Sequence, residues 1–139
     1  MQYKIKTPDA IDSSIQLPAS KSISNRALIL NGLSLNPLNI ENLSDCDDTN
    51  VMIEAFTSGS TLIDVKAAGT SMRFLTAYLS IMPGEWIITG TERMKERPIH
   101  ILVDALTSLG ARIEYLGKIG YPPLKIKGTA LDGGEIYLS

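Results

Sequence analysis

Basic and hydroxyl side chains gather near the N-terminus at a spacing that suits the binding of an anion. Ser22 and Arg26 are four residues apart, which places them on one face of a helix. Lys21 lies in what would be the opening turn of that helix. A guanidinium can bind two oxygens of a phosphate or carboxylate at once, and an ammonium adds a point charge. The group could clamp an anionic substrate, but the pattern is also typical of a capped surface helix with two solvated cations.

Residues 67–73 predict a second place for an anion. Gly69 would let a ligand approach the backbone, and the hydroxyl residues Thr70 and Ser71 could cap the helix that follows. A helix N-terminus has unpaired backbone N–H groups and partial positive charge, both of which stabilise a phosphate or carboxylate. A glycine-containing turn followed by an ordinary helix cap is the alternative interpretation.

A third segment, residues 92–99, combines charges of both signs with a proline. Pro98 favours a helix start nearby, and the basic residues, Arg97 among them, could contact an anion. The charges could also form a solvated loop in which they compensate one another. Taken singly, each of the three segments is explained at least as well by the simpler structural alternative.

Other residue types that carry chemistry are scarce. Asp45, Asp47 and Asp48 could suggest a metal site, but they precede a predicted helix, whose N-terminus favours negative charge. His100, the only histidine, is expected to be structural or exposed, and Cys46 to be an ordinary residue. The sequence contains no nucleotide-binding glycine loop, nucleophile elbow or cysteine-pair metal motif. The three anion-binding segments are therefore the candidates for function.

Hydrophobic periodicity predicts the elements that must position these residues. Alternating or β-branched runs predict strands at residues 3–7, 13–17, 38–43, 61–65, 86–89, 111–116, 124–127 and 135–138. Helical spacing of apolar residues predicts four helices, through Ile23, Ala27 and Leu30, through Val51, Met52, Ala55 and Phe56, through Met72, Leu75, Leu79 and Met82, and through Leu102, Ala105, Leu106 and Leu109. The first of these stripes is expected to be buried, and the last helix should stop at Gly110. The order predicts an α/β fold of repeated units, with helices covering one face of a mixed sheet.

Length and composition exclude several classes of protein. The 139 residues can bury one core, and a net charge of -2 gives no general attraction to nucleic acid or anionic membranes. No apolar run approaches the roughly 20 residues that cross a bilayer, and the N-terminus lacks the apolar core of a secretory signal. The single cysteine can form no internal disulfide, which fits a reducing setting. We therefore expect a cytoplasmic protein that binds neither nucleic acid nor membranes.

Five motifs carry a far more specific signal: LPASKSISNRALIL, SDCDDTNVMIEAF, AAGTSMRFL, GTERMKERPIHILVDALTSLGA and GYPPLKIKG. In this order they resemble the N-terminal motifs of the 5-enolpyruvylshikimate-3-phosphate (EPSP) synthase family, and together they span nearly the whole chain. The resemblance implies transfer of the enolpyruvyl group of phosphoenolpyruvate to the 5-hydroxyl of shikimate 3-phosphate. This step releases phosphate, proceeds through a tetrahedral intermediate without metal or organic cofactor, and belongs to the shikimate pathway of aromatic amino acid biosynthesis.

The resemblance also implies a fold and an assembly. Family members have two domains of repeated βαβαββ units, an inside-out α/β barrel, which close over the substrates. Residues 1–139 would form most of one incomplete domain in the N-terminal part of such an enzyme, and the complete enzyme would be a monomer. Residues 133–139 fit this expectation, because they read as a turn and a strand with nothing after it to pair with.

The resemblance assigns roles residue by residue. The first motif carries Lys21, implied to contact both substrates and to assist proton transfer, together with Ser22 and Arg26, implied to bind shikimate 3-phosphate. Gly69 of the third motif and Arg97 of the fourth are implied to bind phosphoenolpyruvate. Thr70 and Arg73 are implied to support the site.

Some positions depart from the family pattern. Only residues 57–66 separate the acidic motif from the glycine motif, so the local sheet is expected to be smaller than in many relatives. Ala67 and Phe74 stand where an asparagine and a proline are common, which affects the expected shape around Gly69. A further substrate-binding motif and the acid–base residues of the family would lie beyond Ser139. The 139-residue chain alone is therefore expected to be inactive.

Two alternatives differ from this interpretation. An enolpyruvyl transferase acting on UDP-N-acetylglucosamine would typically carry Lys-Asn in place of Lys21-Ser22 and a reactive cysteine in a glycine loop. A non-catalytic anion-binding module is an alternative of another class.

Overall fold

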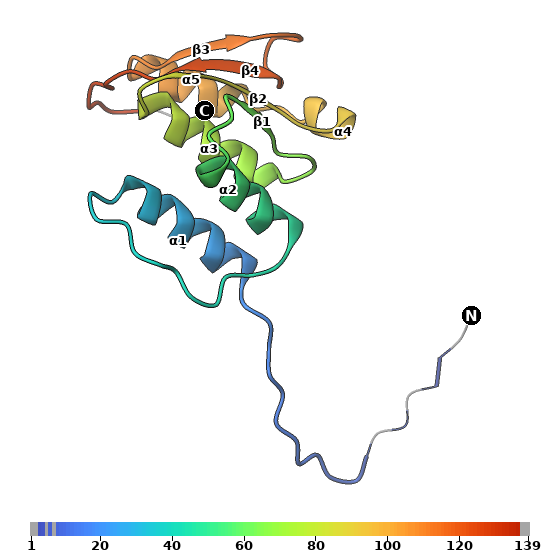
Figure 1. Cartoon of the computed structure of the whole chain (residues 1–139). Helices are drawn as coiled ribbons and strands as arrows, with labels where there is room; N and C mark the ends of the chain where they lie inside the picture. The colour runs from blue at the N-terminus through green and yellow to red at the C-terminus, as the bar shows by residue number, and fades with distance from the viewer. Residues whose placement is uncertain (1–2, 5, 7, 137–139) are drawn as a thin grey trace.

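A mixed four-stranded sheet carries helices on one of its faces in the computed structural model, which describes residues 3–4, 6 and 8–136 (Figure 1). The strands are β1 (Leu62–Asp64), β2 (Glu85–Thr89), β3 (Arg112–Tyr115) and β4 (Leu124–Lys127), arranged in the order β1-β2-β4-β3. β1 runs parallel to β2, and β4 is antiparallel to both of its neighbours. The helices are α1 (Lys21–Leu33), α2 (Asp47–Thr57), α3 (Gly69–Ile81), α4 (Glu92–Lys95) and α5 (His100–Ser108). This arrangement confirms the predicted α/β class.

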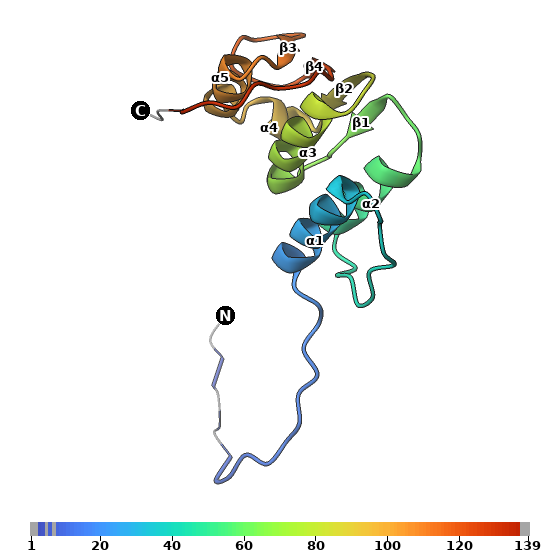
Figure 2. The ribbon, with the colours of Figure 1, turned by 90° about the vertical axis from the view of Figure 1, so that its left-hand side faces the viewer.

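The two faces of the sheet differ in polarity because side chains alternate along each strand. Leu124 and Ile126 of β4 are fully buried in the same apolar cluster as Met72 of α3. Lys125 and Lys127 lie on the other face, where both form ion pairs with Glu85 of β2, at 3.5 and 3.2 Å. The apolar face is covered by α3 and α5, while α1 and α2 lie farther from the sheet (Figures 1 and 2).

Four of the predicted strands are confirmed, at 61–65, 86–89, 111–116 and 124–127, and two are wrong. Residues 13–17 form no strand, and Ile15 and Leu17 are largely exposed, because no described strand runs beside them to pair with their backbone. This segment runs away from the helices in both views (Figures 1 and 2). The strands predicted at 3–7 and 135–138 lie partly outside the described residues.

Residues 38–43 form a loop rather than the predicted strand. The Asn31 side chain accepts a hydrogen bond from the Leu38 backbone N–H (2.8 Å) and donates one to the Leu38 carbonyl (3.0 Å). Farther along, Asn42 adopts a positive φ of 55°. A side chain of α1 therefore satisfies both backbone groups of Leu38, which a neighbouring strand would otherwise have bound.

All four predicted helices are confirmed, but the apolar stripe of α1 is not buried as expected. Ile23 and Leu30 are 70% and 69% exposed, and the buried residues of α1 are Ser24 and Asn25. Instead, α1 packs Leu28 and Ile29 against the apolar cluster. Its buried polar residues bind the segment around α2: the Ser44 N–H donates to the Ser24 hydroxyl, and the Thr49 hydroxyl donates to the side-chain oxygen of Asn25, each at 2.9 Å. These contacts hold α1 against α2.

The end of α5 confirms the role predicted for Gly110. This glycine has a φ of +98°, and its N–H donates to the Thr107 carbonyl at 2.9 Å. The Ala111 N–H donates to the Leu106 carbonyl at 3.0 Å. The two bonds form the glycine-dependent motif that commonly ends a helix.

Candidate functional site

The first predicted segment opens α1 as expected. Ser20 is the N-cap residue, and its hydroxyl accepts a hydrogen bond from the Ile23 N–H at 3.4 Å. Lys21 and Ser22 occupy the first two helical positions, and both are exposed. The side chains predicted to meet a substrate thus lie at the solvent-facing start of a helix.

Lys21 has a charged partner on another helix. Its ammonium Nζ lies 3.4 Å from Oδ2 of Asp48, and the two side chains are 49% and 23% exposed. The backbone carbonyl of Asp48 accepts a hydrogen bond from the Ser71 hydroxyl at 3.0 Å. These two contacts bring together the N-terminal turns of α1, α2 and α3.

Asp48 has a role that the sequence did not indicate, in addition to its place at a helix N-terminus. Asp47 and Asp48 lie in the first turn of α2, which confirms their predicted position at a helix N-terminus. Sequence reasoning missed the contact of Asp48 with Lys21, because 27 positions separate the two residues and no local spacing signals the pair.

Arg26 and Ser22 lie on the same helix face, as predicted, but the guanidinium binds the backbone. Nη1 of Arg26 donates to the Ser22 carbonyl at 3.0 Å. Its guanidinium carbon lies 5.6 Å from the ring centroid of Phe74 on α3. The cation is therefore held between α1 and α3, partly by the aromatic face.

The second predicted segment opens α3 at least two residues earlier than capping by its hydroxyl groups would require. Gly69 is the first helical residue, Ala68 is the N-cap, and no side chain caps the helix. The expectation that Thr70 and Ser71 cap α3 is wrong, because both lie inside the first turn. Thr70 is exposed, and the Ser71 hydroxyl binds Asp48 instead.

Gly69 and Arg97, predicted to share one ligand, are in close contact. A Cβ atom placed on Gly69 would lie 2.5 Å from Nη1 of Arg97 and 2.9 Å from its guanidinium carbon. The guanidinium therefore occupies the space that any larger residue would need. Glycine here allows the cation to sit directly against the first turn of α3.

Arg73, predicted as a support, ties this contact to the rest of the fold. Nη1 donates to the Gly69 carbonyl and Nη2 donates to the Pro98 carbonyl, both at 3.1 Å. One guanidinium thus joins the start of α3 to the residue that follows Arg97. This bridge limits how far the two segments can separate.

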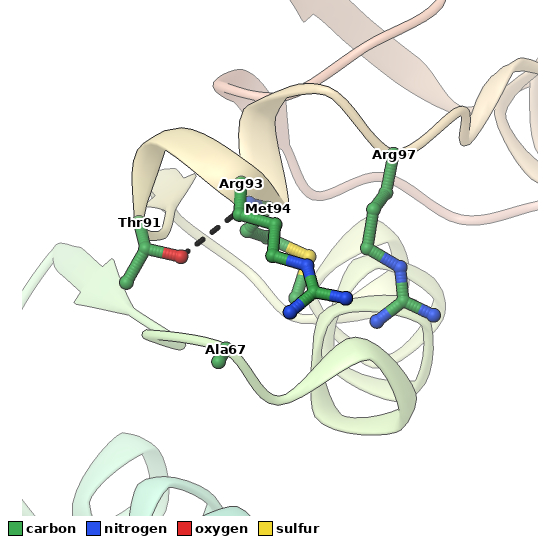
Figure 3. Close-up of a pocket in the computed structure, with 5 residues that line it drawn as sticks. All are labelled: Ala67, Thr91, Arg93, Met94 and Arg97. Atoms are coloured by element: carbon green, nitrogen blue, oxygen red, sulfur yellow. Dashed lines mark hydrogen bonds between the residues drawn. The ribbon is translucent and has the colours of Figure 1, made fainter.

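A pocket of about 440 Å³ lies beside these residues. Its lining residues are Ala67, Thr91, Arg93, Met94 and Arg97 (Figure 3). The guanidinium groups of Arg93 and Arg97 point to the same side of it (Figure 3). No acidic residue is among those that line it in the described part of the chain, so the pocket is suited to an anion.

The short helix α4, which the sequence did not predict, places one of these cations. The Thr91 hydroxyl caps α4 by accepting from the Met94 N–H at 3.4 Å, and Met94 is buried in the core. Arg93 was missed as a site residue. No local spacing marks it, because Arg97 lies beyond the end of α4 and only the tertiary structure brings the two guanidinium groups to one pocket.

Lys21, Ser22 and Arg26 lie outside the set that lines this pocket. The structure thus forms two cationic groups, one at the start of α1 and one at the start of α3. The Lys21–Asp48 and Ser71–Asp48 contacts connect them.

The remaining candidates lie apart from this chemistry. His100 is exposed in the first position of α5, in line with its predicted structural or exposed role. Burial raises the pKa of Cys46, the N-cap residue of α2, but hydrogen bonds with Ser44 and Thr49 outweigh burial and lower the pKa below its ordinary value of 9.0.

Within residues 3–4, 6 and 8–136, no group of three or more His, Cys, Asp or Glu side chains could hold a metal ion. Of the helices in this part of the chain, none combines the length and apolar character that crossing a membrane requires.

One family matches the chain over most of its length. The family model for EPSP synthase (3-phosphoshikimate 1-carboxyvinyltransferase) matches residues 5–59 and 55–139. A 3-phosphoshikimate 1-carboxyvinyltransferase from Bacteroides fragilis (strain YCH46) is 61% identical over 138 residues, which cover 99% of this chain and 34% of the relative. A protein of the same name from Photobacterium damsela subsp. piscicida is 43% identical over 152 residues, covering 91% of this chain and 36% of the relative.

A solved structure supports the fold. EPSP synthase from Acinetobacter baumannii superposes with a TM-score of 0.79 at 22% sequence identity, covering 88% of this chain and 34% of that chain. The chain spans about a third of the length of the curated relatives it matches.

Proposed function

The chain belongs to the EPSP synthase family, and we propose that it contributes part of the substrate-binding surface of a 3-phosphoshikimate 1-carboxyvinyltransferase. The enzyme would transfer the enolpyruvyl group of phosphoenolpyruvate to the 5-hydroxyl of shikimate 3-phosphate and release phosphate. This step belongs to the shikimate pathway of aromatic amino acid biosynthesis. A cytoplasmic site of action fits the single cysteine thiol.

The contact between Gly69 and Arg97 carries this proposal. It sets a guanidinium against the first turn of a 13-residue helix, beside a pocket of about 440 Å³. Backbone N–H groups and the helix dipole would add to the attraction for an anion bound there. We assign this place to phosphoenolpyruvate, with Arg73 holding the two segments together through its bonds to Gly69 and Pro98.

The start of α1 would bind the second substrate. Lys21, Ser22 and Arg26 are exposed at this point, and shikimate 3-phosphate carries a phosphate and a carboxylate that suit their charges. Lys21 belongs to the group at the start of α1, and its ion pair with Asp48 links it to the start of α3, so we assign it contacts with both substrates and assistance to proton transfer.

The cations would act mainly by offsetting the repulsion between two anions. Bringing phosphoenolpyruvate and shikimate 3-phosphate into reacting geometry is unfavourable without positive charge around them. Fixed guanidinium and ammonium groups supply that charge without reorganising during the reaction. In this way the chain would orient the substrates and stabilise the tetrahedral intermediate.

We propose that residues 1–139 form most of one incomplete domain of a monomeric enzyme. Groups needed for turnover would come from sequence equivalent to the two thirds of the relatives that this chain does not match. The 139-residue chain should therefore bind substrate weakly and show no turnover. Phosphate release from the two substrates by the purified chain would contradict this assignment.

Titration of the purified chain tests the binding assignment. Calorimetry should detect phosphoenolpyruvate binding that weakens about tenfold or more in Arg97→Gln, because a charge-assisted hydrogen bond is lost. Shikimate 3-phosphate binding should weaken similarly in Arg26→Ala. Arg112→Gln, which removes an exposed arginine on β3 outside the pocket, is the control.

Three outcomes of these titrations would contradict the proposal. Binding of both substrates that is unaltered in Arg97→Gln and Arg26→Ala would place the substrates elsewhere. Failure of the chain to bind either substrate would contradict the assignment of these residues to substrate binding. Binding of UDP-N-acetylglucosamine in preference to shikimate 3-phosphate would point to the other enolpyruvyl transferase.

A further inference from the structure

The guanidinium groups of Arg93 and Arg97 line the same pocket. In the part of the chain that the structure describes, neither forms an ion pair with a carboxylate. Both side chains are exposed, and both line the pocket beside Gly69 (Figure 3). The ion pairs among the described residues involve Lys21, Lys95, Lys125 and Lys127 but neither arginine. Two unpaired guanidinium groups directed to one side of a cavity repel each other unless an anion lies between them.

The environment of α4 explains why Arg93 is left without a partner. The nearest acidic residue in sequence, Glu92, is bound to Lys95 at 2.8 Å. The local carboxylate is therefore already engaged by the other basic residue of the same helix. Arg93 keeps its full set of five donors for another acceptor.

The backbone of α4 around Arg93 is fixed by contacts of Thr91 and Met94. Met94, the next residue, is 2% exposed and belongs to the main apolar cluster. The Thr91 hydroxyl caps α4, and the Thr91 backbone N–H donates to the Lys66 carbonyl at 3.0 Å, which ties the start of α4 to the end of β1. Because Met94 is buried, α4 cannot rotate about its axis. Arg93 therefore stays on the side of α4 that lines the pocket.

We propose that Arg93 is a second substrate-binding guanidinium of this pocket and binds the same anionic group as Arg97. The proposal rests on the assignment of the pocket to phosphoenolpyruvate and adds to it a residue that the family resemblance does not supply. A phosphoryl group has three oxygens that can accept from two guanidinium groups at once, one more than a carboxylate has. Arg93 therefore favours the phosphoryl end of the substrate as the group bound between the two arginines.

Phosphate titration of the chain, followed by NMR of the arginine Nε–H signals, tests this assignment. Inorganic phosphate and phosphoenolpyruvate should shift the signals of both Arg93 and Arg97 and leave that of Arg112 in place. Arg93→Gln should weaken phosphoenolpyruvate binding about tenfold, while Arg93→Lys should recover part of the loss because it keeps the charge without the planar fork. Thermal unfolding of both variants should match that of the wild type, since the Arg93 side chain is exposed.

Different outcomes separate failure of this inference from failure of the proposed function. If Arg97→Gln weakens binding but Arg93→Gln binds like the wild type, the pocket assignment stands and the role of Arg93 is wrong. If neither variant alters the binding of phosphoenolpyruvate, both are wrong. Equal weakening by Arg93→Gln and by the control Arg112→Gln would also overturn the inference, because it would reflect net charge alone.

Discussion

Nζ of Lys21 lies 3.4 Å from Oδ2 of Asp48, so a cation assigned to substrate binding is paired with a carboxylate of another helix. The backbone of the same aspartate is bound by Ser71 at the start of α3. Asp48 therefore lies between the two cationic groups of the candidate site. An incoming anion must compete with this carboxylate for the Lys21 ammonium.

Replacing Asp48 with asparagine should strengthen anion binding. Asp48→Asn removes the competing charge and frees Lys21, while its backbone carbonyl can still accept from Ser71. A partly exposed ion pair contributes up to about 1 kcal/mol, so the gain in affinity for shikimate 3-phosphate should not exceed about fivefold. Calorimetric titration at low salt measures it. Asp47→Asn, on the same helix turn, serves as control, and weaker binding by Asp48→Asn would show that the aspartate orients Lys21 for its substrate.

A methyl group at Gly69 should weaken binding without weakening the fold. In Gly69→Ala the new Cβ would meet Nη1 of Arg97 at 2.5 Å, and the flexible arginine side chain would move away rather than the backbone. Alanine is also a better helix residue than glycine by about 1 kcal/mol. We expect an unchanged or higher melting temperature together with weaker binding of phosphoenolpyruvate, measured by thermal unfolding and calorimetry.

Gly133→Ala provides the comparison for this variant. A Cβ atom at Gly133 would meet nothing within 4 Å, so it should leave binding unaltered. Wild-type affinity in Gly69→Ala would mean that the position of Arg97 is unimportant for the anion.

The buried contact between α1 and α2 should be sensitive to loss of a hydroxyl. The Thr49 hydroxyl donates to the Asn25 side-chain oxygen at 2.9 Å, and both residues are almost fully buried. Thr49→Val keeps the shape but leaves the amide oxygen without this donor, which should destabilise the protein by about 1–3 kcal/mol. Chemical denaturation measures the change. Thr57→Val, which removes an exposed hydroxyl bonded to Ile53 in the same helix, should have a much smaller effect.

The charged face of the sheet should make a small contribution to stability that disappears in acid. A hydrogen bond from Lys127, followed by the charges of Lys125 and Lys127, lowers the pKa of Glu85 below its ordinary value of 4.5. Because the folded-state pKa is lowered, the contribution is present above the unfolded-state pKa and is lost as the pH falls through the folded-state value.

Glu85→Gln should therefore reduce the dependence of unfolding free energy on pH below 4.5 and leave its slope near neutrality unaltered. Denaturation curves at a series of acidic pH values test this, with Glu41→Gln, an exposed loop substitution, as control. An identical acid dependence in wild type and Glu85→Gln would show that the ion pairs do not persist in solution.

Local patterns in the sequence were sufficient for most of the elements that build this fold. The Ser20 cap, the apolar residues of α3 and the glycine at 110 each act within one or two helical turns, so their effect does not depend on distant residues. The alternation of apolar and basic residues also predicted the strand at 124–127. In the structure Leu124 and Ile126 are buried in the core, and the two lysines lie on the opposite face of the sheet. The same local signals placed Lys21 in the opening turn of a helix, whereas Gly69 was expected before the cap of α3 and is its first helical residue.

Tertiary contacts decided what local periodicity left open. Alternation at 13–17 cannot form a strand without a partner, and the backbone at 38–43 was bound by Asn31 instead. In α1, Leu28 and Ile29 rather than the predicted stripe pack against the core, beside the buried Thr49–Asn25 hydrogen bond. The ion pair of Lys21 with Asp48 and the approach of Arg97 to Gly69 join residues more than 25 positions apart, and a sequence period carries no information about which distant side chains will meet.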